Sequence, residues 1–341
     1  MREAAVTRKW TSEALASKGD SSGLTPPSEE ARSALLLLRT PFQAWIAEQV
    51  LRAEGVAEYE LLYFTQHDSV EDRHYFRHLA EGCELAKYCY APVRLFDILG
   101  HLDFRRRVGG WYRDRGFDLV LLASIDAFVP NAIARRQRSA ALVTFDDGTG
   151  NFNSQGIYHV DRLNPRGRLY RRMFGATDLK SIHARVVRHY TMYPQFTNIV
   201  GPDRMRMLAG WQTENDRSTG EGTRNYFIGA PFEQVMTADQ IRLFEGYLRG
   251  QKIDYYVKHP RERRILEIGV PLLDKGGRIA EDAIVLNAGE FRIHVIGWFS
   301  TVLFNLGAVA QRRTMVLFRG DPRSAHMAQL AETAGCETVF L

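Results

Sequence analysis

The 341-residue sequence predicts an α/β protein of two units, each a parallel sheet covered by helices on both faces. Short apolar stretches of strand length alternate with longer stretches of helical pattern over residues 33–145, and the alternation resumes at Arg224. The strand-length stretches are apolar throughout, which is typical of parallel strands buried on both faces. Right-handed crossovers bring the carboxyl ends of such strands to one edge, so we expect the side chains that follow the strands to share a crevice.

The first unit begins with a run of leucines and a clear helix start. Thr40 can cap the helix that follows the first strand, and Pro41 is tolerated at its first position. The predicted strands cover residues 33–39, 60–64, 88–93, 117–123 and 142–145, and further helices cover 68–84, 95–115 and 127–138. Residues 151–222 are less regular and contain two basic amphipathic pieces, at 168–174 and 184–193.

The second unit follows a polar stretch at 213–222 whose composition is linker-like. Its predicted strands cover 226–229, 254–257, 283–286, 292–296 and 314–318, and its helices cover 237–249, a segment after Thr301, and 322–334. The predicted domains are therefore a flexible leader (1–32), an N-terminal domain (33–215), a C-terminal domain (223–320) and a terminal helix and strand (321–341).

The composition fits a soluble globular protein, with 45% hydrophobic and 25% charged residues and a net charge of +5. Arginine dominates the basic runs, which suits anionic small molecules or an anionic membrane face better than a nucleic-acid groove, so we expect no nucleic-acid partner. Three cysteines without metal spacing argue against a zinc site and a disulfide framework, and they fit a reducing, cytoplasmic compartment. No apolar run reaches membrane length, and residues 1–32 lack the apolar segment of a signal peptide.

An acidic turn follows the fifth predicted strand. The apolar run 140–143 leads into Asp146 and Asp147, and Gly148 permits a sharp turn. Two adjacent buried acids repel one another unless donors, a cation or solvent lie nearby. The turn is either a site at the carboxyl edge of the sheet or an Asp-Gly loop with capping carboxylates, and the residues alone favour the loop.

Two polar segments follow predicted strands of the second unit. Lys258, His259 and Pro260 come after the second strand, where the imidazole can bind an anion and donate a proton, or where the segment is a basic surface loop. Ser300 and Thr301 precede a predicted helix, where hydroxyls and free backbone N–H groups can bind a phosphate or simply cap the helix.

A carboxylate follows the first predicted strand of the second unit. Glu233 comes shortly after Gly229 and is either a candidate general base or a first-turn acid that complements a helix dipole. The sequence contains no P-loop, no dinucleotide-binding fingerprint, no His-Glu-x-x-His and no Gly-x-Ser-x-Gly.

Taken in order, these segments resemble the lipooligosaccharide sialyltransferase group of glycosyltransferase family 52. The similar segments are 145–151 (acidic motif), 257–261 (His-Pro motif), 299–301 (paired hydroxyls), 189–191, and Thr40 with Gln43 beside the opening strand. The resemblance runs from about Ser33 to the C-terminus. Each motif is short, so the ordered set rather than any one motif carries the resemblance.

The resemblance implies a GT-B architecture, in which two Rossmann-like domains face each other across a cleft. It implies an inverting, metal-independent transfer of sialic acid from CMP-sialic acid, held mainly by the C-terminal domain, to a terminal galactose-type sugar of a lipooligosaccharide or related glycolipid, with no cofactor. The expected roles are an acid or phosphate donor for His259 and phosphate ligands for Ser300 and Thr301, because one phosphate can be stabilised by such groups without Mg²⁺. The remaining expected substrate-binding residues are Lys258, Pro260, Gly148, Gly229, Thr40 and Gln43. Peripheral attachment to the inner membrane and a homodimer stay open.

The general base also stays open, because the sequence departs from the family at one strand end. Family members with sialyltransferase activity resemble Gly-x-Pro-Asp where this chain reads Gly-Ala-Pro and then Phe232, which cannot take a proton. Glu233, Asp146 or Asp147 can take the role. The departure leaves open two alternatives: another nucleotide sugar such as a UDP-sugar as donor, and a non-catalytic glycan-binding protein.

Overall fold

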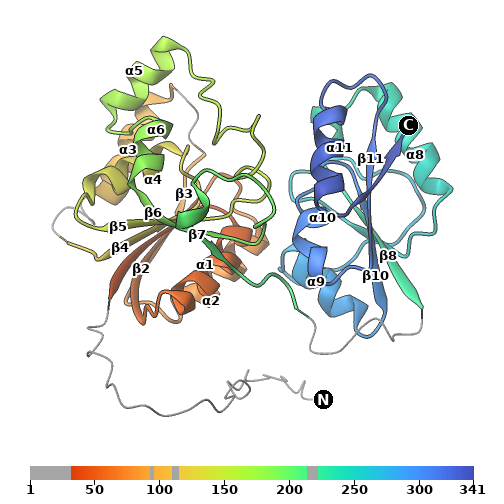
Figure 1. Ribbon diagram of the computed structural model, residues 1–341, viewed down its shortest axis with the longest axis horizontal. Helices are drawn as coiled ribbons and strands as arrows, with labels where there is room; N and C mark the ends of the chain where they lie inside the picture. Colours follow the sequence, from red (N-terminus) through yellow and green to blue (C-terminus); the bar gives the residue numbers. More distant parts are fainter. Residues whose placement is uncertain (1–31, 93–95, 110–114, 213–221) are drawn as a thin grey trace. The chain divides into compact units, whose positions relative to one another are not determined.

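The described chain forms two fully parallel sheets, the first of seven strands and the second of five (Figure 1). The structure is a computed structural model, and it describes residues 32–92, 96–109, 115–212 and 222–341. The predicted leader up to residue 31 and most of the predicted linker, residues 213–221, lie outside the described residues.

The strand order of the first sheet is β3-β2-β1-β4-β5-β6-β7. The strands are β1 (Ser33–Leu38), β2 (Glu58–Thr65), β3 (Leu85–Tyr90), β4 (Leu119–Leu122), β5 (Ala141–Phe145), β6 (Val186–Thr191) and β7 (Met205–Met207). The chain adds strands on one side of β1 and then continues with β4 on the other side, so the order reverses between β1 and β4. Such a reversal opens a crevice at the carboxyl ends of the strands, where α/β sheets bind ligands.

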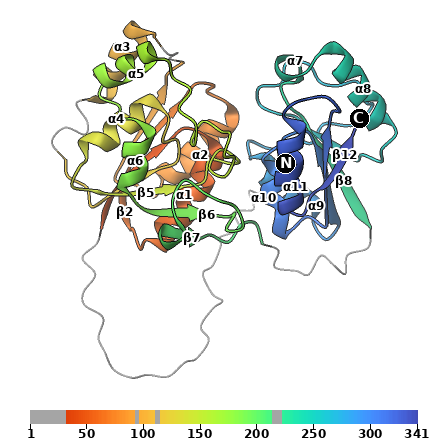
Figure 2. The ribbon, with the colours of Figure 1, turned by 45° about the horizontal axis from the view of Figure 1, so that its top comes forward.

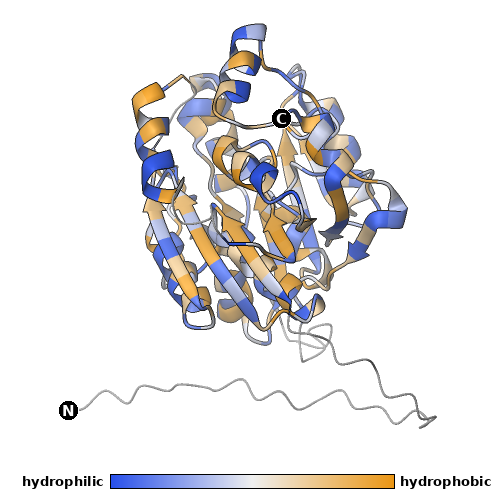
Figure 3. Ribbon diagram, turned by 90° about the vertical axis from the view of Figure 1, so that its left-hand side faces the viewer, coloured by the Kyte–Doolittle hydropathy of each residue, from blue (hydrophilic) through white to orange (hydrophobic). Residues whose placement is uncertain are grey.

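Helices cover both faces of the first sheet. They are α1 (Pro41–Ala53), α2 (Val70–Ala80), α3 (Ile98–Gly109), α4 (Phe128–Arg136), α5 (Pro165–Met173), α6 (Leu179–Arg185) and the 3₁₀ turn η1 (Pro202–Arg204). Leu36 and Leu38 of β1 pack into one core with α1 and α2, while Leu35 and Leu37 pack into another with α3, α4 and α6. Burial on both faces is the physical reason that β1 is apolar from Ala34 to Leu38, and Figure 3 shows long hydrophobic stretches in the strands.

The second sheet has the strand order β12-β11-β10-β8-β9. Its strands are β8 (Thr223–Ile228), β9 (Tyr255–Val257), β10 (Arg292–Gly297), β11 (Arg312–Leu317) and β12 (Glu337–Phe340). Its helices are α7 (Phe232–Val235), α8 (Ala238–Arg249), α9 (Ala280–Ala288), α10 (Val302–Asn305), η3 (Leu306–Ala308) and α11 (Ser324–Thr333). α7 and α8 cover one face, and α9, α10 and α11 cover the other (Figure 2).

Local signals explain several helix starts. Thr40 accepts a hydrogen bond from the backbone N–H of Gln43 at 3.2 Å, as predicted for a cap. Thr237 and Gln240 form a reciprocal capping box at the start of α8. Each cap satisfies backbone N–H groups that the first turn of a helix leaves without partners.

One predicted strand is wrong. Residues 283–286 form part of helix α9, which ends at Gly289, where φ is 56°. Ile284 and Ala288 are buried on one side of the helix, whereas Leu286 is exposed. A short apolar run does not by itself distinguish a strand from a helix, and here the helix continues beyond the run at both ends. Strands β6 and β7 were not predicted, because their segments are basic and only partly apolar.

Direct contacts join elements of the two sheets. Trp211 Nε1 donates to Asp282 Oδ1 at 2.7 Å, and the Tyr75 hydroxyl donates to the other oxygen of Asp282. The Tyr193 hydroxyl contacts the Asn305 side chain, which in turn donates to Glu281 at 2.6 Å. The second sheet's helices α9 and α10 thus meet polar groups of the first half of the chain.

Candidate active site

A chain of hydrogen bonds links three neighbouring strand ends of the first sheet. Gln43, in the first turn of α1 after β1, donates to Ser124 Oγ at 2.7 Å, and Ser124, just after β4, donates to Asp147 Oδ2 at 3.0 Å. Asp147 follows β5 and also accepts a hydrogen bond from the Tyr158 hydroxyl. Because the strand order reverses between β1 and β4, this chain lies at the edge where the fold predicts a ligand site.

The two acids of the turn have different environments. Asp146 is 0% exposed, accepts the backbone N–H of Met192 at 2.7 Å, and lies 3.3 Å from His189 Nε2. Asp147 is partly exposed, and its backbone N–H donates to Asn151 Oδ1 at 2.6 Å. Each acid has its own donors, which resolves the repulsion expected of adjacent carboxylates. Asp146 holds β5 and β6 together, and Asp147 is the acid of the pair that solvent or a ligand can reach.

The acidic turn contacts the hydroxyl pair of the second half. A side-chain carbon placed on Gly148 would lie 2.8 Å from Thr301 Cγ2 and 3.0 Å from Thr301 Oγ1. Gly148 also has a φ of 66°, which side chains rarely adopt. Glycine is required here for two reasons: the turn needs a positive φ, and the backbone comes too close to Thr301 to leave space for a side chain.

The hydroxyl pair precedes a very short helix. α10 contains four residues, and Thr301 at its start makes no side-chain capping bond. Ser300 Oγ accepts the backbone N–H of Val302 at 3.3 Å, and the preceding Phe299 has a φ of 40°, a rare conformation for a residue with a side chain. The predicted helix start is present, but one turn carries little dipole, so any anion binding here depends on the hydroxyls and nearby N–H groups.

His259 follows β9 with one ring nitrogen already occupied. Its Nδ1 accepts the backbone N–H of Arg261 at 3.0 Å, and its own backbone N–H donates to Glu262 Oε2 at 3.1 Å. An acceptor at Nδ1 places the proton of the neutral ring on Nε2, which is the atom left for a ligand. Burial, helped by the charges of Arg261 and Lys275, lowers the pKa of His259 to about 4.

Glu262 is a residue that sequence reasoning missed. It is buried, it orients the backbone of His259, and its side chain accepts the Tyr256 hydroxyl. Burial raises the pKa of Glu262 to about 7. A side-chain carbon on Gly229 would lie 2.2 Å from Glu262 Oε2, so this glycine makes room for the carboxyl group rather than for a substrate. The signal in the sequence was one acid inside a basic run, Arg261 to Arg264.

The position where the chain departs from the family faces the core. Phe232 is 1% exposed and packs between Phe227 and Phe244. Glu233 is exposed on the surface of α7. A phenylalanine at 232 is therefore part of the packing of α7 and α8 against the sheet, and the neighbouring carboxylate points to solvent.

The structure brings some of the predicted site residues together and leaves others apart. Gln43, Asp147, Gly148 and Thr301 form one contiguous set, with Thr40 capping the helix that carries Gln43. His259, with its exposed neighbours Lys258 and Pro260, makes no hydrogen bond to Asp147, Ser300 or Thr301 within the described residues. No group of three or more metal-binding side chains occurs among the residues that the structure describes. None of the described helices is long and apolar enough to cross a membrane.

Two parallel sheets, each covered by helices on both faces, form the GT-B fold. A solved structure described as the glycotransferase of kitacinnamycin has this arrangement, with a TM-score of 0.50 and 12% identity over 91% of this chain and 86% of that one. The chain belongs to glycosyltransferase family 52, whose family model matches residues 66–316. The predicted GT-B fold and family are confirmed.

Two curated relatives have similar lengths. An N-acetyllactosaminide alpha-2,3-sialyltransferase of Haemophilus influenzae is 25% identical over 279 residues, which cover 80% of this chain and 88% of the relative. A CMP-N-acetylneuraminate:beta-galactoside alpha-2,3-sialyltransferase of Pasteurella multocida is 25% identical over 278 residues, which cover 80% and 86%. The similarity to these two proteins extends well beyond the short motifs.

Proposed function

We propose that the protein is an inverting, metal-independent sialyltransferase. It transfers sialic acid from CMP-sialic acid to a terminal galactose-type sugar of a lipooligosaccharide or related glycan. Both curated relatives carry sialyltransferase names, and that of the Pasteurella multocida protein includes CMP-N-acetylneuraminate and a beta-galactoside. The single observation that carries the proposal is the contact of the Asp147–Gly148 turn with Thr301, because it brings the turn that carries Asp147 against the hydroxyl pair of the second half.

Asp147 is the general base in this proposal. A base must be reachable and held by donors that leave one oxygen free, and within the described residues Asp147 accepts through Oδ2 alone, from Ser124 and Tyr158. Asp146 is fully buried and already paired, and Glu233 is exposed on the surface of α7. We therefore assign to Asp147 the removal of the proton from the acceptor hydroxyl group.

His259 Nε2, Ser300 and Thr301 bind the phosphate of CMP in this proposal. A neutral imidazole with its proton on Nε2 donates a hydrogen bond, and a bound phosphate dianion raises the pKa of the ring. When CMP leaves, these donors and Lys258 stabilise the charge on its phosphate, so the reaction needs no metal ion.

A peripheral contact with an anionic membrane completes the proposal. Leu99 and Leu102 on α3 and Leu169 and Met173 on α5 are exposed apolar side chains, and arginines lie beside them on the same helices. The ring of Tyr170 on α5 contacts Phe96 and His101 near α3, so the two helices are neighbours. Apolar side chains among arginines on adjacent helices suit the interface of an anionic lipid surface.

A transfer assay in EDTA with CMP-sialic acid and a lactoside tests the proposal. We expect wild-type protein to form a sialyl-lactoside, and Asp147→Asn to lose about 10²–10⁴-fold in rate, the usual contribution of a general base. Glu233→Gln is the matched control and keeps its rate. Loss of rate in Glu233→Gln alone would move the base to that residue. A wild-type protein whose melting temperature rises with UDP but not with CMP, and which transfers no sialic acid, would contradict the donor assignment.

A further inference from the structure

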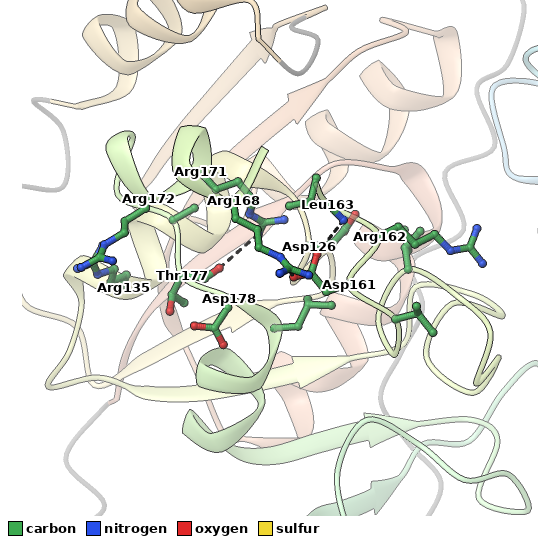
Figure 4. Close-up of a pocket in the computed structure, with 14 residues that line it drawn as sticks. Asp126, Arg135, Asp161, Arg162, Leu163, Arg168, Arg171, Arg172, Thr177 and Asp178 are labelled. Atoms are coloured by element: carbon green, nitrogen blue, oxygen red, sulfur yellow. Dashed lines mark hydrogen bonds and ion pairs between the residues drawn. The ribbon is translucent and has the colours of Figure 1, made fainter. Parts of the chain in front are cut away.

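An arginine-rich cavity of about 470 Å³ lies on the first half of the chain, between α5, α6 and the loops that follow β4 and β5 (Figure 4). Five arginines line it, against three aspartates: Arg135, Arg162, Arg168, Arg171 and Arg172. Its volume is in the range of sites that hold a small ligand. None of the predicted site residues lines this cavity.

The cavity adjoins the hydrogen bonds around Asp147. Asp126 in its wall comes two residues after Ser124, and Ile157 in its wall directly precedes Tyr158. Ser124 and Tyr158 are the two donors to Asp147. The charge of Asp147 helps to raise the pKa of Asp126, so the cavity and Asp147 lie close together, on either side of the buried side chains of Ser124 and Tyr158.

Two buried polar atoms of the cavity have no partner among the described residues. They are Asp126 Oδ1 and Arg171 Nε. In native structures nearly all buried polar atoms are hydrogen-bonded, so unpaired atoms in the wall of a cavity indicate positions that a ligand can satisfy. Figure 4 shows the guanidinium groups of Arg168 and Arg171 directed toward the region of Asp126 and Asp161, while Arg162 extends away.

The charges of the cavity leave a net attraction for anions. Asp161 is paired with Arg168 at 2.9 Å, and Asp178 accepts hydrogen bonds from Ser181. Burial raises the pKa of Asp126, and this favours the neutral carboxyl group. Burial lowers the pKa of Arg171, and an anion bound beside the guanidinium group would raise that pKa again. Within the described part of the chain Arg171 forms no ion pair with a carboxylate, although the charge of Asp126 acts on it, and its side chain makes a 3.5 Å contact with the carbonyl oxygen of Thr177.

We propose that this cavity binds a phosphorylated sugar of the acceptor, with the phosphate on Arg171 and its neighbouring arginines and a sugar hydroxyl group on Asp126. The inference rests on the proposed function, because it makes the cavity an extension of the acceptor site beside Asp147. Guanidinium groups bind phosphate oxygens through paired N–H donors, and a carboxyl group without a partner suits a sugar hydroxyl group. The cavity then selects acceptors whose inner sugars carry phosphate.

Calorimetric binding of two soluble probes tests the proposal: lactose, and lactose carrying a phosphate on its glucose unit. We expect wild-type protein to prefer the phosphorylated probe by at least tenfold, and Arg171→Met to lose most of that ratio. Arg166→Met is the matched control, because Arg166 is an exposed arginine of the same helix that does not line the cavity, and it keeps the ratio. Asp126→Asn keeps or increases the preference, because it removes any remaining negative charge.

Further measurements separate the possible failures. Equal affinity of wild-type protein for both probes overturns the proposal, even if sialic acid is transferred to lactose. If wild-type protein prefers the phosphorylated probe but does not bind CMP, the proposal for the cavity stands and the proposed donor is wrong. Vesicles of phosphatidylglycerol give the third arm: if Arg171→Met abolishes vesicle binding and leaves the preference among lactosides unchanged, the cavity binds a lipid headgroup and the proposal is wrong.

Discussion

The backbone of Gly148 lies against the side chain of Thr301, with room for no side-chain carbon between them. The acidic turn belongs to the first sheet and Thr301 to the second, so this contact is a direct link between the groups proposed to handle acceptor and donor. A change that separates the two surfaces should therefore affect transfer more than it affects folding.

Gly148→Ala tests this contact. The added carbon would meet Thr301 at 2.8 Å, and the φ of 66° adds about 1–2 kcal/mol of backbone strain. Gly55→Ala is the matched control, since Gly55 has the same φ of 66° with no atom within 4 Å of the new carbon. We expect both variants to lose stability in urea unfolding, Gly148→Ala more because of its added contact with Thr301, and only Gly148→Ala to lose most of its transfer rate. Equal rates in the two variants would contradict the role of the contact.

CMP binding should take up a proton through His259. The pKa of the free ring is about 4, below its ordinary value, and a bound phosphate raises it, so part of the ring becomes charged on binding near pH 6. Calorimetry in buffers of different ionisation enthalpy measures this uptake. His259→Gln should bind CMP more weakly and with less proton uptake. An unchanged uptake would show that His259 does not face the phosphate.

Glu281 should make the protein less stable as the pH rises. Burial raises its pKa to about 7, above the ordinary 4.5, and Asn305 donates to it. A carboxyl group whose pKa is higher in the folded state stabilises the folded protein fully below its unfolded-state pKa of 4.5. This contribution to the free energy of unfolding, up to about 3 kcal/mol, is lost as the pH rises through the folded-state pKa of about 7. Glu281→Gln keeps the hydrogen bond without the charge. Its melting temperature should exceed that of wild-type protein increasingly from pH 5 to pH 8, and a constant difference would refute the assignment.

Phe232→Asp should unfold the second half rather than improve the enzyme. The side chain is buried between Phe227 and Phe244, so an aspartate creates a cavity and a buried charge that together cost more than about 3 kcal/mol. Phe232→Leu, which keeps the site apolar, should cost about 1–2 kcal/mol. Chemical denaturation measures both values. A stable and more active Phe232→Asp variant would show that this position faces the substrate.

Leu99→Glu and Met173→Glu should weaken binding to anionic vesicles several-fold in a sedimentation assay. Both side chains are largely exposed, 80% and 70%, so their replacement spares the core while placing a charge where the lipid contact is proposed. Leu243→Glu is the control, because Leu243 is also exposed but lies on α8 of the second sheet. Equal binding by all three variants would argue against this surface.

Much of the fold was predictable from local pattern. The uniform apolar character of residues 34–38 follows from burial on both faces of a parallel sheet, and the Thr40 cap marks the start of α1. The same reasoning failed at 283–286, where a four-residue apolar run fits either period, and at β6, where a basic segment forms an inner strand.

The sequence by itself determined the class of fold, the order of the elements and the positions of the acidic turn, the His-Pro segment and the hydroxyl pair. Only the tertiary structure decided that Asp146 is buried while Asp147 is reachable, that Glu262 holds the backbone of His259, and that Arg171 and Asp126 share a cavity. The physical reason is that periodicity and capping depend on near neighbours in the chain. Burial, hydrogen-bond partners and shifts in pKa depend on groups that the fold brings from distant segments, such as Thr301 against Gly148.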